Sequence, residues 1–325
     1  MRGHPRLSIG LPVYNAEQYL EQSLRAVLGQ TFEDFELIIS SNASTDGTDE
    51  ICREYAREDS RVRFLRQPQN IGASPNHNFV FDQSTAPLFK WVSGDDLYAR
   101  DLLGRCIAML DDDPGLVLAH SWTAAIDGEG RLIQALPYPL LTECQRPEER
   151  LHSLLFAGDE MPGAIRADDF YGVIRSDVLR KVKPLGSYYH SDVTYMAELA
   201  LHGRFGLVPE WLYFRRQHTG RALEANPTVR SWCSNLDPRR ADRLRNPTVR
   251  LVGEYGWENV ALIGRSGLGL PDKVRCYRVM GEWMASRVVR RVVGHHDARD
   301  GRPEHALADP PLSVPDLVSG QREAS

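Results

Sequence analysis

The acidic pair in Gly94-Asp95-Asp96 is the part of this sequence best suited to chemistry. It directly follows an apolar segment, residues 87–93 (PLFKWVS), that is typical of a buried strand. Adjacent carboxylates at such a strand end repel each other and lose solvation, and a divalent cation with oxygen ligands would relieve both costs. The alternative is an acidic helix start, where the helix dipole stabilises carboxylates. We favour a metal site because other polar loops are expected to converge on the same edge of the sheet.

Two more positions suggest chemistry. His218 ends the run Arg215-Arg216-Gln217-His218, which follows a strand-like segment, and its arginines suit a diphosphate. A single histidine is more often structural. Asp192 precedes the helical segment VTYMAELALHG, where it can act as a plain N-cap or as a base at the edge of a pocket.

Alternating strands and helices must position these residues. Strands are predicted at 7–13, 35–40, 62–67, 87–93 and 116–120, with helices near 16–30, 48, 74–83 and 100–111. Asn15 is expected to cap the first helix, and Thr45 or Asp46 the second. This alternation predicts an α/β fold with a mostly parallel sheet flanked by helices. Ligands bind beyond the carboxyl ends of such strands, so three polar loops should meet there, after Val13, after Ser40 and at Gly94.

The second half of the sequence is less regular. Helices are predicted near 147–156 and 271–293, a linker at 221–248, and a disordered tail at 295–325 because that segment is polar and rich in proline. The basic amphipathic segment 271–293 can pack on its own domain, contact an anionic membrane or form a homodimer.

Composition excludes several classes of protein. The 325 residues are 42% hydrophobic with a net charge of -5, so nucleic acid is not expected as a partner. Five scattered cysteines without CxxC spacing argue against a disulfide framework or a zinc site. With no signal-peptide pattern or apolar run of about 18 residues, a cytoplasmic protein is expected, peripheral at most to the inner face of the membrane.

Several motifs, in this order, resemble a family 2 glycosyltransferase with the GT-A fold. The resemblance rests on LSIGLPVYNAEQYLEQSLRAVLGQTFEDFELIISSNASTDGT, then NIG and GDD, and later YGVIRSDVLRKV, SDVTYMAELALHGRF and FRRQH. It covers roughly residues 7–220. The implied organisation is a catalytic domain at 1–220, with a nucleotide-sugar-binding half at 1–120 and an acceptor half at 121–220. A helical extension at 221–294 would follow.

The resemblance also implies roles for individual residues. Donor nucleotide contacts fall on Pro12, Tyr14, Asn42 and Asp95, ligands of Mn²⁺ or Mg²⁺ on Asp96 and His218, the diphosphate contact on Arg216, and the catalytic base on Asp192. Ser41 and Asn42 stand where the family often has two aspartates. A UDP-sugar is favoured, while guanine and thymine nucleotides remain open.

The expected reaction is an inverting sugar transfer to a hydroxyl or amine, in the biosynthesis of envelope polysaccharide, glycolipid or a secondary metabolite. Acceptor contacts are expected from aromatic and acidic residues of the second half: Trp122, Asp168, Asp169, Tyr171, Tyr188 and Tyr189. Two alternatives stay open, a catalytically silent scaffold that binds nucleotide sugars and a nucleotidyltransferase. The latter is disfavoured because no Gly-rich loop follows the first strand.

Overall fold

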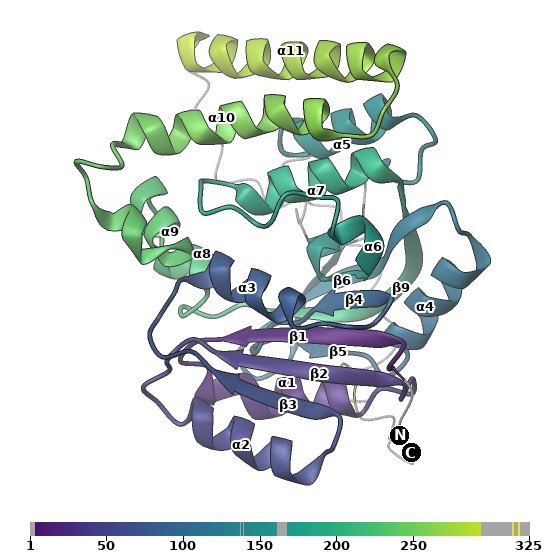
Figure 1. Cartoon of the computed structure of the whole chain (residues 1–325), viewed down its shortest axis with the longest axis vertical. Helices are drawn as coiled ribbons and strands as arrows, with labels where there is room; N and C mark the ends of the chain where they lie inside the picture. Colours follow the sequence, from purple (N-terminus) through teal and green to yellow (C-terminus); the bar gives the residue numbers. More distant parts are fainter. Residues whose placement is uncertain are drawn as a thin grey trace.

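The computed structural model describes residues 4–136, 138, 140–160, 168–293, 314 and 318. Its centre is one sheet with the strand order β3-β2-β1-β4-β8-β6-β9-β5, and β7 pairs with β6 at its side. Helices cover both faces of this sheet (Figure 1). The predicted α/β fold is therefore confirmed.

The N-terminal half of the sheet is entirely parallel. Its strands are β1 (Leu7–Val13), β2 (Phe35–Ser41), β3 (Val62–Arg66) and β4 (Leu88–Trp91). The connecting helices are α1 (Glu17–Leu28), α2 (Thr48–Glu58) and α3 (Ala73–Asp82). Alternate side chains of each strand serve opposite faces: Leu37 and Ile39 join the core under α1, while Ile38 joins the core under α3.

The second half of the sheet is mixed rather than parallel. It comprises β5 (Leu97–Tyr98), β6 (Leu116–Ile126), β7 (Leu132–Leu136), β8 (Val173–Arg175) and β9 (Arg204–Arg216). Only β6 and β9 pair in parallel there, whereas β8 pairs antiparallel with both β4 and β6. The helical elements of this half are α4 (Leu102–Asp112), α5 (Pro147–Glu160), η1 (Asp168–Tyr171), α6 (Ser176–Leu179) and α7 (Ser191–His202).

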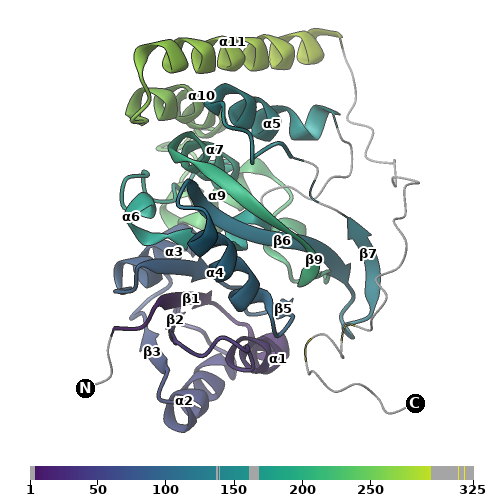
Figure 2. The same cartoon turned by 90° about the vertical axis from the view of Figure 1, so that its right-hand side faces the viewer.

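A helical layer completes the molecule, and its last two helices lie at one end of the long axis (Figures 1 and 2). It contains α8 (Ala222–Ala225), α9 (Val229–Leu236), η2 (Pro238–Ala241), α10 (Thr248–Arg265) and α11 (Leu270–Val293). The segment 221–248, expected to be a linker, thus contains three short helices. A separate apolar core joins α10 and α11 to α5 and α7, with Leu262, Met280 and Trp283 buried in it.

Most of the segment 295–325, predicted to be disordered, lies outside the described residues. Val314 and Val318 are described, and both pack against the core under α1. No helix of the described ranges is long and apolar enough to cross a membrane.

Candidate active site

A cleft of about 480 Å³ opens beyond the carboxyl ends of β1, β2 and β4. This is the edge at which the three polar loops were expected to meet, and the volume is in the range of small-molecule sites. Its walls come from both halves of the chain. They include Pro12, Tyr14, Tyr19, Asn42, Asn70, Asn76, His77, Asp95, His218 and Arg221.

Asp95 and His218 meet at this cleft although 123 positions separate them. His218 Nε2 lies 2.9 Å from Asp95 Oδ2, and the imidazole packs on the Tyr19 ring with centroids 4.9 Å apart. Burial raises the pKa of Asp95, but hydrogen bonds from His218 and Ser93 outweigh it and hold the pKa below its usual value. Asp95 is therefore an anion at the cleft wall.

Asp96 points into the protein. Its carboxylate is 2% exposed, accepts hydrogen bonds from the Arg216 backbone N–H and the Tyr213 hydroxyl, and does not line the cleft. Burial, reinforced by the charge of Asp95, raises the pKa of Asp96 to about 7. This geometry revises the expected roles: Asp95, rather than Asp96, faces the cleft beside His218.

Arg216, expected at the diphosphate, is fully buried and holds the acidic loop in place. Its guanidinium donates to four oxygens: the backbone oxygens of Asp95, Asp127 and Gly128, and the side chain of Gln22. Since an arginine side chain has five N–H groups, little capacity is left for a phosphate. The structure thus gives Arg216 a positioning role.

Arg221 is a cation at the cleft that sequence reasoning missed. Its backbone N–H bonds to the His218 carbonyl at 3.2 Å, so a tight turn brings it back to the acidic loop. Burial lowers its pKa, but the surrounding acidic groups, Asp96 foremost among them, together outweigh burial and raise the pKa above its usual value. Its guanidinium makes no hydrogen bond or ion pair with another described residue. The only signal for Arg221 in the sequence was its position three residues after His218, the candidate metal ligand.

Pro12, Tyr14 and Asn42, the residues predicted to contact the nucleotide, also line the cleft. Asn42 is 3% exposed, and both ends of its amide are fixed. Its oxygen accepts from the Ile71 backbone N–H at 2.8 Å, and its nitrogen donates to Asn70 at 3.0 Å. Tyr14, by contrast, is 48% exposed and free to stack on a planar ring.

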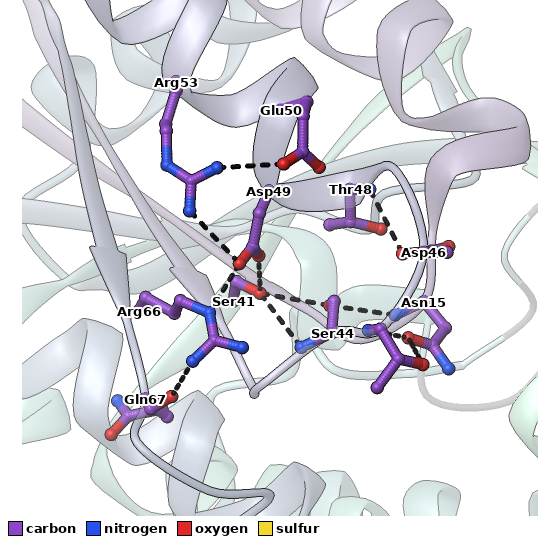
Figure 3. A network of polar contacts seen from close by, with 11 residues as sticks. Asn15, Ser41, Ser44, Asp46, Thr48, Asp49, Glu50, Arg53, Arg66 and Gln67 are labelled. Atoms are coloured by element: carbon purple, nitrogen blue, oxygen red, sulfur yellow. Dashed lines mark hydrogen bonds and ion pairs between the residues drawn. The ribbon is translucent and has the colours of Figure 1, made fainter.

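A polar network fixes the loop after β2 to its neighbours (Figure 3). Ser41, at the first family-divergent position, donates to the buried carboxylate of Asp49 at 2.5 Å, and Arg66 of β3 donates to the other oxygen at 2.5 Å. Asn15 accepts from the Thr45 N–H at 2.9 Å. Asn15 therefore ties two loops together and does not cap α1, whose N-cap is Ala16.

Asp192 is the second residue of α7. It is therefore not the N-cap, which was one of its two predicted roles, because His190 occupies that position. Asp192 Oδ1 is buried without a hydrogen-bond partner. The loop before α7 is bonded to α3, which lines the cleft: Ser74 donates to the Gly186 carbonyl at 2.8 Å, and Asn78 bonds both backbone groups of Leu185. Asp192 itself is not among the cleft residues.

Of the three favoured acceptor residues, Asp169 and Tyr171 share the short helix η1, whereas Trp122 lies on β6. Trp122 packs on Trp211 of β9, with ring centroids 4.8 Å apart. Asp169 is fully buried beneath the site and accepts from the Tyr138 hydroxyl at 2.7 Å, while its other oxygen has no partner. Tyr171 packs on Tyr213, the residue that bonds Asp96.

Asp95 and His218 fit one side of a divalent-metal site. Carboxylate oxygen and imidazole nitrogen are both ligands of Mn²⁺, and the two atoms already lie side by side. Among the described residues no group of three His, Cys, Asp or Glu side chains could enclose an ion. The protein would therefore supply two ligands, an arrangement typical of ions that also bind substrate phosphates.

Comparison with known proteins decides the family. Residues 8–176, about half of the chain, match the model of "Glycosyl transferase family 2". The chain belongs to this family. An uncharacterised glycosyltransferase of Haemophilus influenzae is 32% identical over 130 residues, which are 40% of this chain and 52% of that protein. The putative teichuronic acid biosynthesis glycosyltransferase TuaG of Bacillus subtilis is 31% identical over 101 residues, 31% of this chain and 40% of TuaG. The matched region thus spans about half of these relatives or less.

Solved structures confirm the GT-A fold of this family 2 glycosyltransferase. S. aureus TarS (residues 1–349) in complex with UDP-GlcNAc superposes with a TM-score of 0.61 at 16% identity, covering 88% of this chain and 74% of that one. The mannosyltransferase PcManGT of Pyrobaculum calidifontis, in complex with GDP-Man and Mn²⁺, has a TM-score of 0.50 at 15% identity, covering 90% and 89%.

Proposed function

We propose that this glycosyltransferase moves a sugar from a nucleotide-sugar donor, a UDP-sugar by preference, to a hydroxyl or amine of its acceptor with inversion of the anomeric centre. The pairing of Asp95 with His218 at the cleft carries the proposal. The ligands in the similar structures, UDP-GlcNAc in one and GDP-Man with Mn²⁺ in the other, support a nucleotide sugar and a metal. TuaG, named for teichuronic acid biosynthesis, supports an envelope polysaccharide as one acceptor class.

Mn²⁺ or Mg²⁺ would bind Asp95 and His218 and would stabilise the negative charge of the departing diphosphate. Asp96 and Arg216 hold the loop that presents Asp95. Arg221 lies beside the same carboxylates and makes no side-chain hydrogen bond within the described part of the chain, so it is our candidate for the diphosphate contact. Tyr14 and Asn42, which line the same cleft, would contact the nucleotide.

Asp192 is proposed as the base that removes the acceptor proton. A buried carboxylate oxygen without a partner, on a helix start fastened to the cleft wall, is suited to that task. Asp192→Asn should lower turnover by about 10²–10⁴-fold, the usual contribution of a general base, with little change in donor affinity. Asp177→Asn is the matched control, because Asp177 is the second residue of α6 and its partner is the exposed Lys181. Near-normal turnover of Asp192→Asn would remove the base assignment.

Donor binding and hydrolysis test the function as a whole. The protein and its Asp95→Asn variant are incubated with UDP-, GDP- and dTDP-sugars, with and without Mn²⁺ or Mg²⁺, and the melting temperature and free nucleotide are measured. We expect one donor to stabilise the wild type only with metal, slow nucleotide release, and loss of both in Asp95→Asn. Stabilisation without nucleotide release, even with candidate acceptors, would favour the silent scaffold. No response to any donor would contradict the proposal.

A further inference from the structure

Exposed apolar side chains are concentrated in the C-terminal helical layer. Among the described residues eleven large hydrophobic side chains are exposed, and eight of them lie between residues 244 and 284. The most exposed of these are Leu244, Val249, Trp257 and Leu270, at 95%, 79%, 69% and 76%. Soluble monomers rarely gather such residues in one place unless the surface binds something.

Helix α11 has two apolar stripes. Cys276, Met280 and Trp283 form the first, which is buried against α5, α7 and α10. The second comprises Leu270, Val274, Tyr277 and Met284, which recur every three, four or seven residues and so share one face. All four are exposed. Packing within the domain therefore uses one stripe and leaves the other uncovered by the described residues.

The exposed stripe continues onto α10. Tyr277 lies over Gly264, since a Cβ at that glycine would be 3.4 Å from the Tyr277 hydroxyl. Trp257 is two helical turns before Gly264, hence on the same face of α10. The two helices lie together at the end of the molecule's long axis (Figures 1 and 2). We call this surface, formed by Trp257, Leu270, Val274, Tyr277 and Met284, the end face.

Charge separates this end from the rest of the protein. Residues 237–293 contain twelve Lys and Arg against six Asp and Glu, although the whole chain has 39 against 44. Residues 237–293 thus carry a net charge of +6, and the rest of the chain carries a net charge of −11. Lys273 and Arg278 flank the exposed stripe on its two sides. An apolar stripe with basic flanks is the pattern of a helix that lies in the surface of an anionic bilayer.

We propose that the end face binds an anionic membrane surface, with α11 in the plane of the headgroups. A second copy of the chain fits less well, because it would place two basic faces against each other. Val314 and Val318 of the C-terminal segment pack on the sheet core instead of this stripe. The proposal goes beyond sugar transfer and needs no donor or metal.

Vesicle co-sedimentation tests the proposal on the full chain without nucleotide sugar. We expect binding to mixed phosphatidylcholine–phosphatidylglycerol vesicles, weak binding to phosphatidylcholine alone, and loss of binding at high salt. The apolar variant Leu270→Ser/Val274→Ser and the charge variant Lys273→Gln/Arg278→Gln should each weaken binding by about tenfold or more. Emission from Trp257, identified by difference from Trp257→Phe, should shift to the blue on binding.

Exposed apolar residues elsewhere provide the matched control. Ile133→Ser/Leu141→Ser changes two side chains that are 51% and 62% exposed but lie outside the helical layer. This variant should bind vesicles like the wild type, and all variants should keep the wild-type melting temperature. Absence of binding to anionic vesicles, or an equal loss in the control, would overturn the proposal. Light scattering that shows a dimer broken by Leu270→Ser/Val274→Ser, with no vesicle binding, would assign the face to a second copy.

Discussion

Arg216 and Arg221 are five positions apart and differ in what their charge does. Arg216 donates four hydrogen bonds, one to the loop that carries Asp95 and three to Asp127, Gly128 and Gln22. Its guanidinium also stacks on the Tyr19 ring at 4.5 Å. Arg221 lies beside the same loop, and its guanidinium bonds to none of the residues that the structure describes. Removing the first should therefore damage the fold of the site, whereas removing the second should damage binding or catalysis alone.

Arg221→Ala separates these roles by kinetics. We expect kcat/KM to fall by about 10–100-fold, since a hydrogen bond to a charged group contributes roughly 1.5–3 kcal/mol, while the melting temperature stays unchanged. Arg221→Lys should recover part of the loss because it keeps the charge. Arg243→Ala, an exposed arginine of the helical layer, is the control. A variant Arg221→Ala with full activity would show that the cation does not contact the donor.

The buried carboxyl of Asp169 should make the stability of the protein depend on pH. Burial, opposed by the Tyr138 hydrogen bond and aided by Asp168, raises the pKa of Asp169 to about 6 from its usual 3.8. The folded state thus holds a proton that the unfolded state releases, so the stability from this residue is lost as pH rises from about 4 to 6. At roughly 1.4 kcal/mol per pKa unit, the change is about 3 kcal/mol at most.

Asp169→Asn should remove this dependence. In urea unfolding, the variant should gain stability relative to the wild type between pH 4 and pH 7, about 2 kcal/mol by the same conversion. The difference between the two proteins isolates Asp169, because Asp96 titrates in both. A difference that is constant with pH would mean that Asp169 titrates normally.

At the scale of elements, strained and cross-bonded loops shape the cleft. Three residues other than glycine have left-handed backbone among the described ranges: Asn15 (φ 47°), Ala43 (φ 59°) and His190 (φ 55°). Each lies in a loop at the carboxyl end of the sheet or at the start of α7. Such conformations persist only where surrounding contacts impose them, and the network of Figure 3 supplies those contacts after β2.

Asp49 is the centre of that network, and its removal should loosen β2, β3 and α2 together. Asp49→Ala would leave Ser41 and Arg66 without their acceptor, which should lower the free energy of unfolding by about 1–3 kcal/mol. Glu50→Ala is the control: Glu50 is the next residue on α2, is 72% exposed and pairs only with Arg53. It should change stability by less than about 0.5 kcal/mol. Equal effects in urea unfolding would show that the network is not structural.

At the scale of the whole molecule, the helical layer is fixed to the rest of the described chain by packing and by ion pairs, including one to the buried Glu198. Glu198 of α7, which is 3% exposed, accepts two hydrogen bonds from Arg265 of α10, at 3.0 and 2.8 Å. α8 and α9 connect this layer to the cleft, since Ala222, Ala225 and Asn235 line it. The helical layer therefore forms part of the wall of the cleft.

Two methionines one turn apart on α11 test how the layer packs. Met280 is buried at 2% exposure and Met284 is 44% exposed. Met280→Ala should cost about 2–4 kcal/mol of unfolding free energy because it leaves a cavity in the core. Met284→Ala should cost less than about 0.5 kcal/mol. The reverse order in urea unfolding would show that the helix is rotated about its axis.

The sequence by itself determined the alternation of strands and helices in roughly the first 120 residues and the edge of the sheet at which the cleft forms. Apolar periodicity and loop polarity are local signals, and β1, β2, β3 and β4 each begin and end within three residues of their predictions. The meeting of the loops follows from parallel strands, which place all their carboxyl ends at one edge. The family, too, was accessible from motif order.

Only the tertiary structure decided which side chain of each pair faces the cleft. Asp95 and Asp96 are adjacent and chemically identical. Their environments differ because Tyr213 and the Arg216 backbone, over 115 residues away in the sequence, donate hydrogen bonds to the carboxylate of Asp96. Likewise, the Arg216 guanidinium donates to carbonyl groups of two distant loops, whereas the Arg221 guanidinium bonds to no other described residue. Burial and hydrogen-bond partners arise from long-range packing, so no local pattern in the sequence could have assigned them.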